Sequence, residues 1–187
     1  SAVFTPTSTT AFSGSTGNAS FTVVGSNGPF PIPVTFTVGA TGVFTFTANT
    51  NAVTLTVDAA NTTGTGNLNG NAITVSDTRN TTPGWSVTGQ ESNFTGSTTA
   101  TGFSISGNQL GWTPTDTALG TGVTLGATVA PGAPGLGTTA ATLAQAHAGS
   151  GTGTSNLSAN LLLAIPAAQH AGVYSGTLTL TAVQSLP

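Results

Sequence analysis

Few side chains in this sequence are suited to acid–base, nucleophilic or metal chemistry, and they are widely scattered. There are four carboxylates, two imidazoles and no cysteine, at Asp58, Asp77, Glu91, Asp116, His147 and His170. Glycoside hydrolysis requires two facing carboxylates, and a zinc site requires three or four ligands. No spacing among these residues marks either arrangement. We therefore predict no catalytic residue, no metal and no cofactor, and rank a glycan-active enzyme using Asp116 or Glu91 last.

The single cation of the chain stands two residues after an acid. Arg79 is the only lysine or arginine among 187 residues. Residues i and i+2 of an extended chain share a face, so Asp77 and Arg79 are predicted to pair, or to bond carbonyls of the adjoining turn. The arginine stem is a candidate to cover the Trp85 ring. Our interpretation is that Arg79 pins the loop before the strand of Trp85 and Val87; the alternative is contact with an anionic wall component.

The composition excludes several classes of partner. Charged residues make up 3% of the chain and the net charge is −3, whereas nucleic acids and anionic membranes select clusters of lysine and arginine. The longest apolar run, residues 161–165, is far shorter than the roughly 18 residues of a membrane helix. We expect no nucleic-acid partner and no membrane span. A surface rich in Thr, Ser, Gly and Asn is typical of exported proteins.

Apolar residues alternate with Thr or Ser through most of the chain, which is the pattern of half-buried strands. The alternating segments are residues 20–25, 33–38, 42–48, 52–58, 72–77, 84–89, 102–107, 122–129 and 172–183. Stretches rich in Gly, Asn and Pro separate them. This pattern predicts an all-β protein, an immunoglobulin-like antiparallel β-sandwich with long loops. Residues 138–149 are open to a short helix or an irregular strand, and residues 131–138 are expected to form an exposed loop.

The beginning of the chain is interpreted separately. Ser1 is followed by neither a basic nor an apolar region, which predicts a mature chain from which the signal peptide has been removed. Residues 1–18 are predicted to form a short strand and a flexible leader, and residues 19–187 an elaborated β-sandwich domain. The leader strand belongs to the edge of the same domain or, alternatively, completes the sheet of a neighbouring subunit.

Two further aromatic residues have predicted roles. Tyr174 follows an Ala-rich corner and begins a long alternating strand. That is the arrangement of a tyrosine corner, in which the hydroxyl group bonds the backbone of the corner. Trp112 stands beside Pro114 and turn residues, and is the candidate for surface contact with a glycan or the wall, whereas Trp85 is assigned to the core.

The segment from Asp77 to Val87 resembles the WxL family of secreted surface proteins of Gram-positive bacteria. The likeness is carried by Asp77, Arg79, Gly84, Trp85 and Val87, and by the segment "YSGTLTLTAV" at residues 174–183. Leu180 and Ala182 stand where the second motif of the family has Trp and Leu, and Val87 replaces the first Leu. The resemblance covers roughly residues 50–187 and implies non-covalent attachment to the cell wall through peptidoglycan.

These observations together predict a secreted, non-catalytic structural protein of the cell surface. It is wall-associated or part of an extracellular assembly, and its expected partners are cell-wall polysaccharide or peptidoglycan and further copies of itself. The alternatives are a self-assembling filament or pilus-type subunit joined by exchange of its N-terminal strand, and a glycan-binding module. Low charge favours assembly, because subunits with few charges repel one another weakly.

Overall fold

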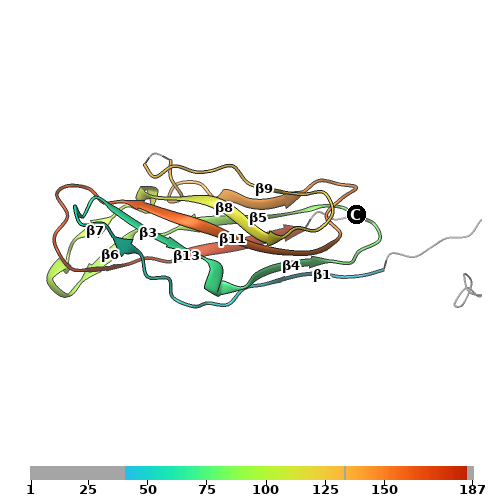
Figure 1. Ribbon diagram of the computed structural model, residues 1–187, viewed down its shortest axis with the longest axis horizontal. Helices are drawn as coiled ribbons and strands as arrows, with labels where there is room; N and C mark the ends of the chain where they lie inside the picture. The colour runs from blue at the N-terminus through green and yellow to red at the C-terminus, as the bar shows by residue number, and fades with distance from the viewer. Residues whose placement is uncertain (1–40, 133, 185–187) are drawn as a thin grey trace, which may run out of the picture. The chain divides into compact units, whose positions relative to one another are not determined.

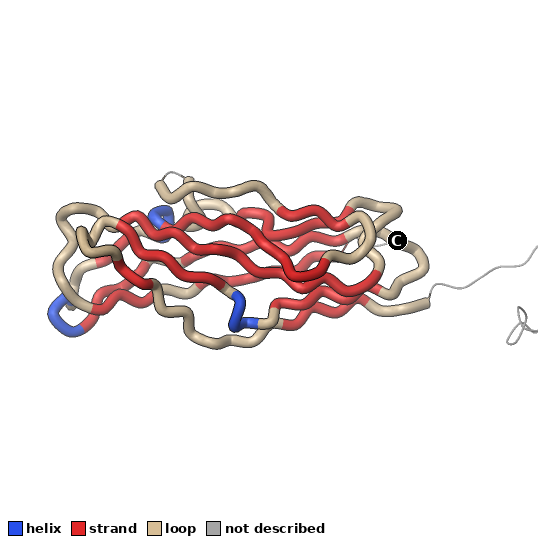
Figure 2. The backbone as a smooth tube through the Cα atoms, in the orientation of Figure 1, coloured by secondary structure: helices blue, strands red, loops and turns tan. Residues whose placement is uncertain are grey.

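The computed structural model describes residues 41–132 and 134–184, which form an all-β protein (Figure 1). The predictions for residues 1–40, including the leader strand, lie outside the described residues. Regular structure here consists of strands and short 3-10 turns (Figure 2). None of the described helices is long and apolar enough to cross a membrane.

The first sheet is built around β11, the longest strand of the described chain. Its order is β1-β4-β11-β3-β2, with β8 on the other side of β11. The bounds are β1 Phe44–Thr47, β2 Thr56–Val57, β3 Thr63–Asn67, β4 Ile73–Asp77, β8 Leu110–Ala118 and β11 Gly153–Ala164. β3 and β4 pair with the two ends of β11 in turn. They therefore act as one long strand, interrupted by the 3-10 turn η1 (Asn69–Asn71).

The second sheet carries the Trp85 segment in its interior, in the order β13-β5-β10-β9. The bounds are β5 Trp85–Glu91, β9 Val123–Leu125, β10 Ala141–Ala146 and β13 Leu178–Gln184. The register of β10 on β5 shifts between Thr142 and Ala144, and Leu143 in the shift is buried. Residues 141–146 are therefore an irregular strand, and the helical alternative for this segment is wrong.

A small third sheet continues two of these strands toward one end. It has the order β12-β6-β7, with β6 Phe94–Ser97, β7 Ser104–Ile105 and β12 Val173–Ser175. β6 follows β5 and β12 precedes β13, so the β12–β6 pair repeats the β13–β5 pair after a break. Two further 3-10 turns, η2 (Thr98–Ala100) and η3 (Gly107–Gln109), flank β7.

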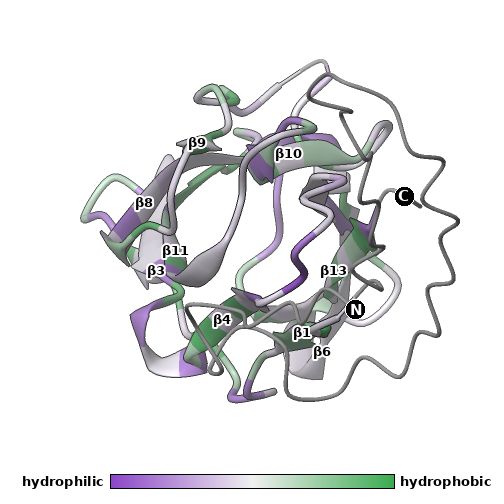
Figure 3. Ribbon diagram, turned by 90° about the vertical axis from the view of Figure 1, so that its right-hand side faces the viewer, coloured by the Kyte–Doolittle hydropathy of each residue, from purple (hydrophilic) through white to green (hydrophobic). Residues whose placement is uncertain are grey.

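The two larger sheets face each other across one hydrophobic core (Figure 3). Alternate residues of β4, β5 and β11 point into this core, because side chains of a strand alternate between its faces. The outer edge of β8 is covered where Trp112 exchanges backbone hydrogen bonds with Val129. The all-β sandwich predicted from the alternation is confirmed.

The loop at residues 131–138 is less exposed than the sequence indicated. Leu136 within it is fully buried. Its backbone donates a hydrogen bond to the Leu110 carbonyl and accepts one from the Glu91 amide. The Gly- and Pro-rich composition correctly predicted a loop, but this leucine anchors the loop to both sheets.

Candidate functional site

Asp77 and Arg79 form a hydrogen-bonded ion pair at the end of β4. The Asp77 carboxylate is fully buried and the Arg79 side chain is 11% exposed. Asp77 Oδ1 accepts hydrogen bonds from the backbone amide and Nε of Arg79 at 3.0 and 2.9 Å, and Oδ2 accepts one from NH2 at 2.7 Å. The pairing predicted from their spacing is confirmed. These bonds lower the pKa of Asp77 and raise that of Arg79.

The same guanidinium group joins the two sheets. NH2 also donates to the Gly84 carbonyl at 3.2 Å, and NH1 donates to Gln184 Oε1 at 3.2 Å. Gly84 immediately precedes β5, and Gln184 ends β13. Arg79 therefore fixes the loop before Trp85, as predicted. The guanidinium carbon also lies 5.1 Å from the ring centroid of Phe44 in β1, and the ring centroids of Phe44 and Trp85 lie 6.3 Å apart. Cover of the Trp85 ring by the arginine stem stays a prediction.

Trp85 and Val87 both point into the core, as the alternation predicted. The indole Nε1 of Trp85 donates to the Gly151 carbonyl at 3.1 Å. Gly84 has a φ of +89°, and a side chain there would lie 2.6 Å from the Ala146 carbonyl oxygen. Glycine before the tryptophan is thus required by both backbone conformation and space.

The two segments that carried the family resemblance are neighbouring antiparallel strands. In the register of β13 on β5, Ala182 lies opposite Val87 and Leu180 lies opposite Gly89. Leu180 and Ala182 are partly buried against the core. The replacements at these two positions therefore keep apolar side chains on the inner face of the second sheet.

Tyr174 occupies the predicted corner. Its hydroxyl group donates to the backbone carbonyl of His170 at 2.9 Å and bonds Gln169 Oε1 at 3.1 Å. The residue lies in β12, opposite Gly96 of β6. The predicted bond from the hydroxyl to the corner backbone is present.

Trp112 is not a surface residue, so its assignment to glycan or wall contact is wrong. It is 1% exposed and is the third residue of β8. Its ring fills the space over Gly89 of the opposite sheet, where a Cβ atom would lie 2.6 Å from the ring, with Leu180 beside it. The sequence indicated a turn at Pro114. Proline is also compatible with an edge strand, and β8 is an edge strand of the first sheet.

The remaining acids do not assemble into a reactive centre. Asp58 is exposed and caps its own turn, where its hydrogen bonds with Thr62 and Thr63 lower its pKa. Asp116 lies exposed on β8. Glu91 is 5% exposed, and its Oε1 has no hydrogen-bond partner among the described residues. Burial raises the pKa of Glu91 to about 7.

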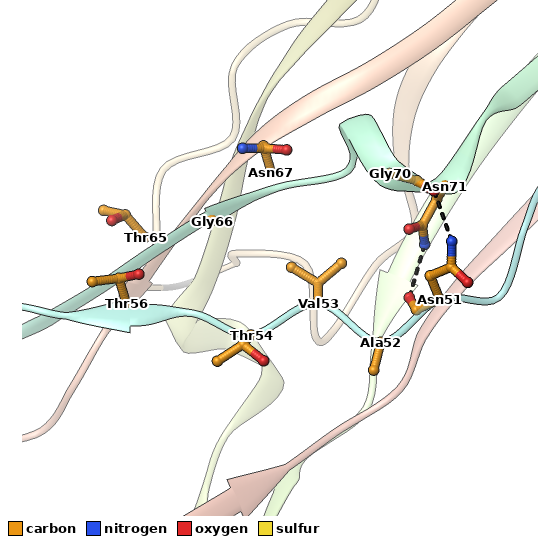
Figure 4. Close-up of a pocket in the computed structure, with 10 residues that line it drawn as sticks. All are labelled: Asn51, Ala52, Val53, Thr54, Thr56, Thr65, Gly66, Asn67, Gly70 and Asn71. Carbon is orange, nitrogen blue, oxygen red and sulfur yellow. Dashed lines mark hydrogen bonds between the residues drawn. The ribbon is translucent and has the colours of Figure 1, made fainter.

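An open groove of about 500 Å³ lies beside η1, between residues 51–56 and 65–71. Asn51 and Asn71 brace it: Asn51 Nδ2 donates to the Gly70 carbonyl at 2.8 Å, and Asn71 Nδ2 donates to the Asn51 carbonyl at 3.1 Å (Figure 4). Its polar lining consists of amides and hydroxyls, with no acid, histidine or aromatic ring. The groove offers hydrogen bonds to a ligand but no group for catalysis.

The structure contains an exposed aromatic pair that the sequence did not predict. Phe103, before β7, stacks on His170, before β12, with 3.7 Å between ring centroids and 20° between ring planes. Both residues are exposed. Phe103 stood in an alternating segment, where an inward position was as consistent with the pattern, and nothing in the sequence linked it to His170, 67 positions later.

The comparisons with known proteins identify the class of protein. The model of the WxL family, described as a surface cell wall-binding domain, matches residues 18–183. The chain belongs to the WxL family, and is a cell wall-binding surface protein in its class. No curated protein and no solved structure matches it.

Replacement of Arg79 by glutamine is expected to destabilise the fold strongly at neutral pH. It leaves the Asp77 carboxylate buried without its cation, which typically costs about 3–5 kcal/mol. The pKa of Asp77 is lower in the folded protein than in the unfolded chain. The ion pair therefore stabilises the fold at pH values above the unfolded pKa, and this stabilisation is lost as the pH falls through the folded pKa. Urea unfolding of the wild type and the Arg79→Gln variant at pH 7 and pH 3 measures the loss of stability at each pH.

The double variant Asp77→Asn/Arg79→Gln is the matched control. It removes the Asp77 charge together with the Arg79 charge, and should recover part of the stability that Arg79→Gln loses at pH 7. An Arg79→Gln penalty of equal size at both pH values would contradict the assigned role of the ion pair.

Replacement of Glu91 by glutamine is expected to stabilise the protein at pH 8 and not at pH 4. The unfolded carboxyl group loses its proton near pH 4.5, whereas the folded one keeps it to about pH 7. The wild-type protein therefore loses stability as pH rises through this window, by about 3 kcal/mol at about 1.4 kcal/mol per pKa unit. Urea unfolding of both proteins at the two pH values tests this. A difference in unfolding free energy between the two proteins that is the same at pH 8 and pH 4 would show that Glu91 is solvated.

Proposed function

We propose that this chain is a secreted, non-catalytic structural protein of the bacterial cell surface, held to the wall by binding peptidoglycan. The observation that carries the proposal is the match of the wall-binding family model to residues 18–183. The structural roles of the acids support the absence of catalysis. Asp77 neutralises Arg79, Asp58 caps a turn, and Glu91 is buried.

Peptidoglycan as the ligand is favoured over anionic wall polymers on grounds of charge. The sequence holds one cation, and it is committed to the buried carboxylate of Asp77. Polyanions are bound mainly through clustered lysine and arginine. A chain of net charge −3 gains little electrostatic binding energy from contact with such a polymer.

Sedimentation with purified peptidoglycan tests the proposal. The protein should co-sediment with peptidoglycan from which the anionic polymers have been stripped, and binding should vary little between 50 and 500 mM NaCl, since few ion pairs form. An unrelated β-sandwich protein of similar net charge serves as the control. Recovery of all the protein in the supernatant would refute peptidoglycan attachment.

A second candidate is a filament or pilus-type subunit joined by strand exchange. It is favoured by the outer edge of β13, which has no neighbouring strand among the described residues. Among the described residues this seven-residue strand pairs with β5 alone, in continuous register, and it carries no charge and no proline. Edge strands are commonly protected by lysine, proline or a bulge. An unprotected edge accepts an added strand, and residues 1–18 of a neighbouring copy are the candidate donor.

Negative-stain microscopy and light scattering over a range of concentrations test this second candidate. Polymers are expected from the full chain and none from a chain that lacks residues 1–18. Polymers in both samples would exclude strand donation by this segment. Monomers in both would leave wall attachment as the function of the chain by itself.

A further inference from the structure

The side chains of the family motif face the wrong way to contact a wall ligand directly. Trp85 and Val87 are buried, and Leu180 and Ala182 are packed against the core. The second tryptophan, Trp112, is also buried. A glycan-binding surface must therefore be formed by other, exposed side chains, and the exposed aromatic pair Phe103–His170 is the strongest candidate.

This pair is displayed on two loops that hold each other in place. Thr99 Oγ1 donates to the Ala171 carbonyl at 2.6 Å, and Gln169 Nε2 donates to the Ser104 carbonyl at 3.3 Å. The Tyr174 hydroxyl group bonds the His170 carbonyl at 2.9 Å. These bonds involve both chain neighbours of His170 and the residue after Phe103, so the rings are presented from a braced support.

The two loops that carry the rings are also closely packed against each other. Ala100 in η2 is fully buried. A Cβ atom on Gly96 would lie 2.9 Å from the Ala100 Cβ atom, and one on Gly172 would lie 2.5 Å from it. The two loops thus meet at the distance that only glycine permits. Ordering of both loops before a ligand arrives lowers the entropy cost of binding.

The chemistry of the pair points to a sugar ring. Phe103 is 39% exposed, which leaves apolar ring surface for the C–H face of a pyranose. The His170 imidazole adds a donor and an acceptor for hydroxyl groups. The only lysine or arginine of the chain is Arg79, and it is paired with Asp77 at the end of β4. A phosphate-rich polymer therefore has no counter-charge here.

We propose that Phe103 and His170 form a stacking platform for one uncharged pyranose of the wall glycan. This rests on the proposed attachment to peptidoglycan and adds the place of contact. The bound sugar lies against the exposed ring surface, and its hydroxyl groups exchange hydrogen bonds with the imidazole.

The test compares binding of the full chain and its variants to stripped peptidoglycan, with chitotetraose as a soluble competitor. Phe103→Ala should raise the dissociation constant about tenfold, the effect of an aromatic contact of about 1.4 kcal/mol. Phe103→Tyr should restore binding, because it keeps the ring. His170→Ala should weaken binding while the Tyr174 bond persists, since that bond uses the backbone carbonyl.

Leu119→Ala is the matched control, because Leu119 is also 39% exposed but lies after β8. It should bind as the wild type does, and all variants should keep the urea midpoint of the wild type. Equal binding by wild type, Phe103→Ala and His170→Ala would overturn the platform and leave peptidoglycan attachment standing. Failure of the wild type to bind would refute the attachment itself. Self-association that Phe103→Ala abolishes, without loss of glycan binding, would instead make the pair a contact between copies.

Discussion

The ion pair between Asp77 and Arg79 is the interaction on which the arrangement of the two sheets depends. A buried carboxylate is tolerated only when a cation and hydrogen bonds satisfy it, and this chain has one cation to offer. The planar guanidinium group meets the carboxylate through two of its nitrogens and has donors left for Gly84 and Gln184. One side chain therefore connects the end of β4, the approach to β5 and the end of β13, and a lysine would not provide this fork.

Packing between the sheets is specified by tryptophans that face glycines. Trp112 of β8 lies over Gly89 of β5, and Trp85 of β5 lies against Gly151, which precedes β11. In each case the absence of a side chain on the glycine makes room for the indole. Leu180, at the position of the second tryptophan of the family motif, lies beside the Trp112 ring.

Much of this organisation could be predicted from local pattern. Alternation indicated β1, β4, β5 and β13, the i,i+2 spacing indicated the Asp77–Arg79 pair, and the position of Tyr174 indicated its corner. Alternation did not indicate β3, β6, β8 or β11, which lie outside the alternating segments. The side-chain placements that the sequence did not predict depend on long-range pairing. Trp112 was placed at the surface because Pro114 resembles a turn, whereas β11 pairs with the whole of β8 and makes it a buried-face edge strand. The Arg79 guanidinium group meets the Phe44 ring and Phe103 stacks on His170, and neither contact could be inferred from the local sequence.

The scarcity of charge has opposite consequences inside and outside the fold. Inside, one cation meets one buried acid, and Glu91 remains buried with an oxygen that has no partner among the described residues. Outside, the edge strand β13 carries none of the charges that normally discourage pairing. Such a surface attracts a ligand through ring stacking and hydrogen bonds, which salt screens weakly, more than through ion pairs. A protein fixed outside a cell meets changing ionic conditions, and an attachment built from uncharged contacts would hold through them.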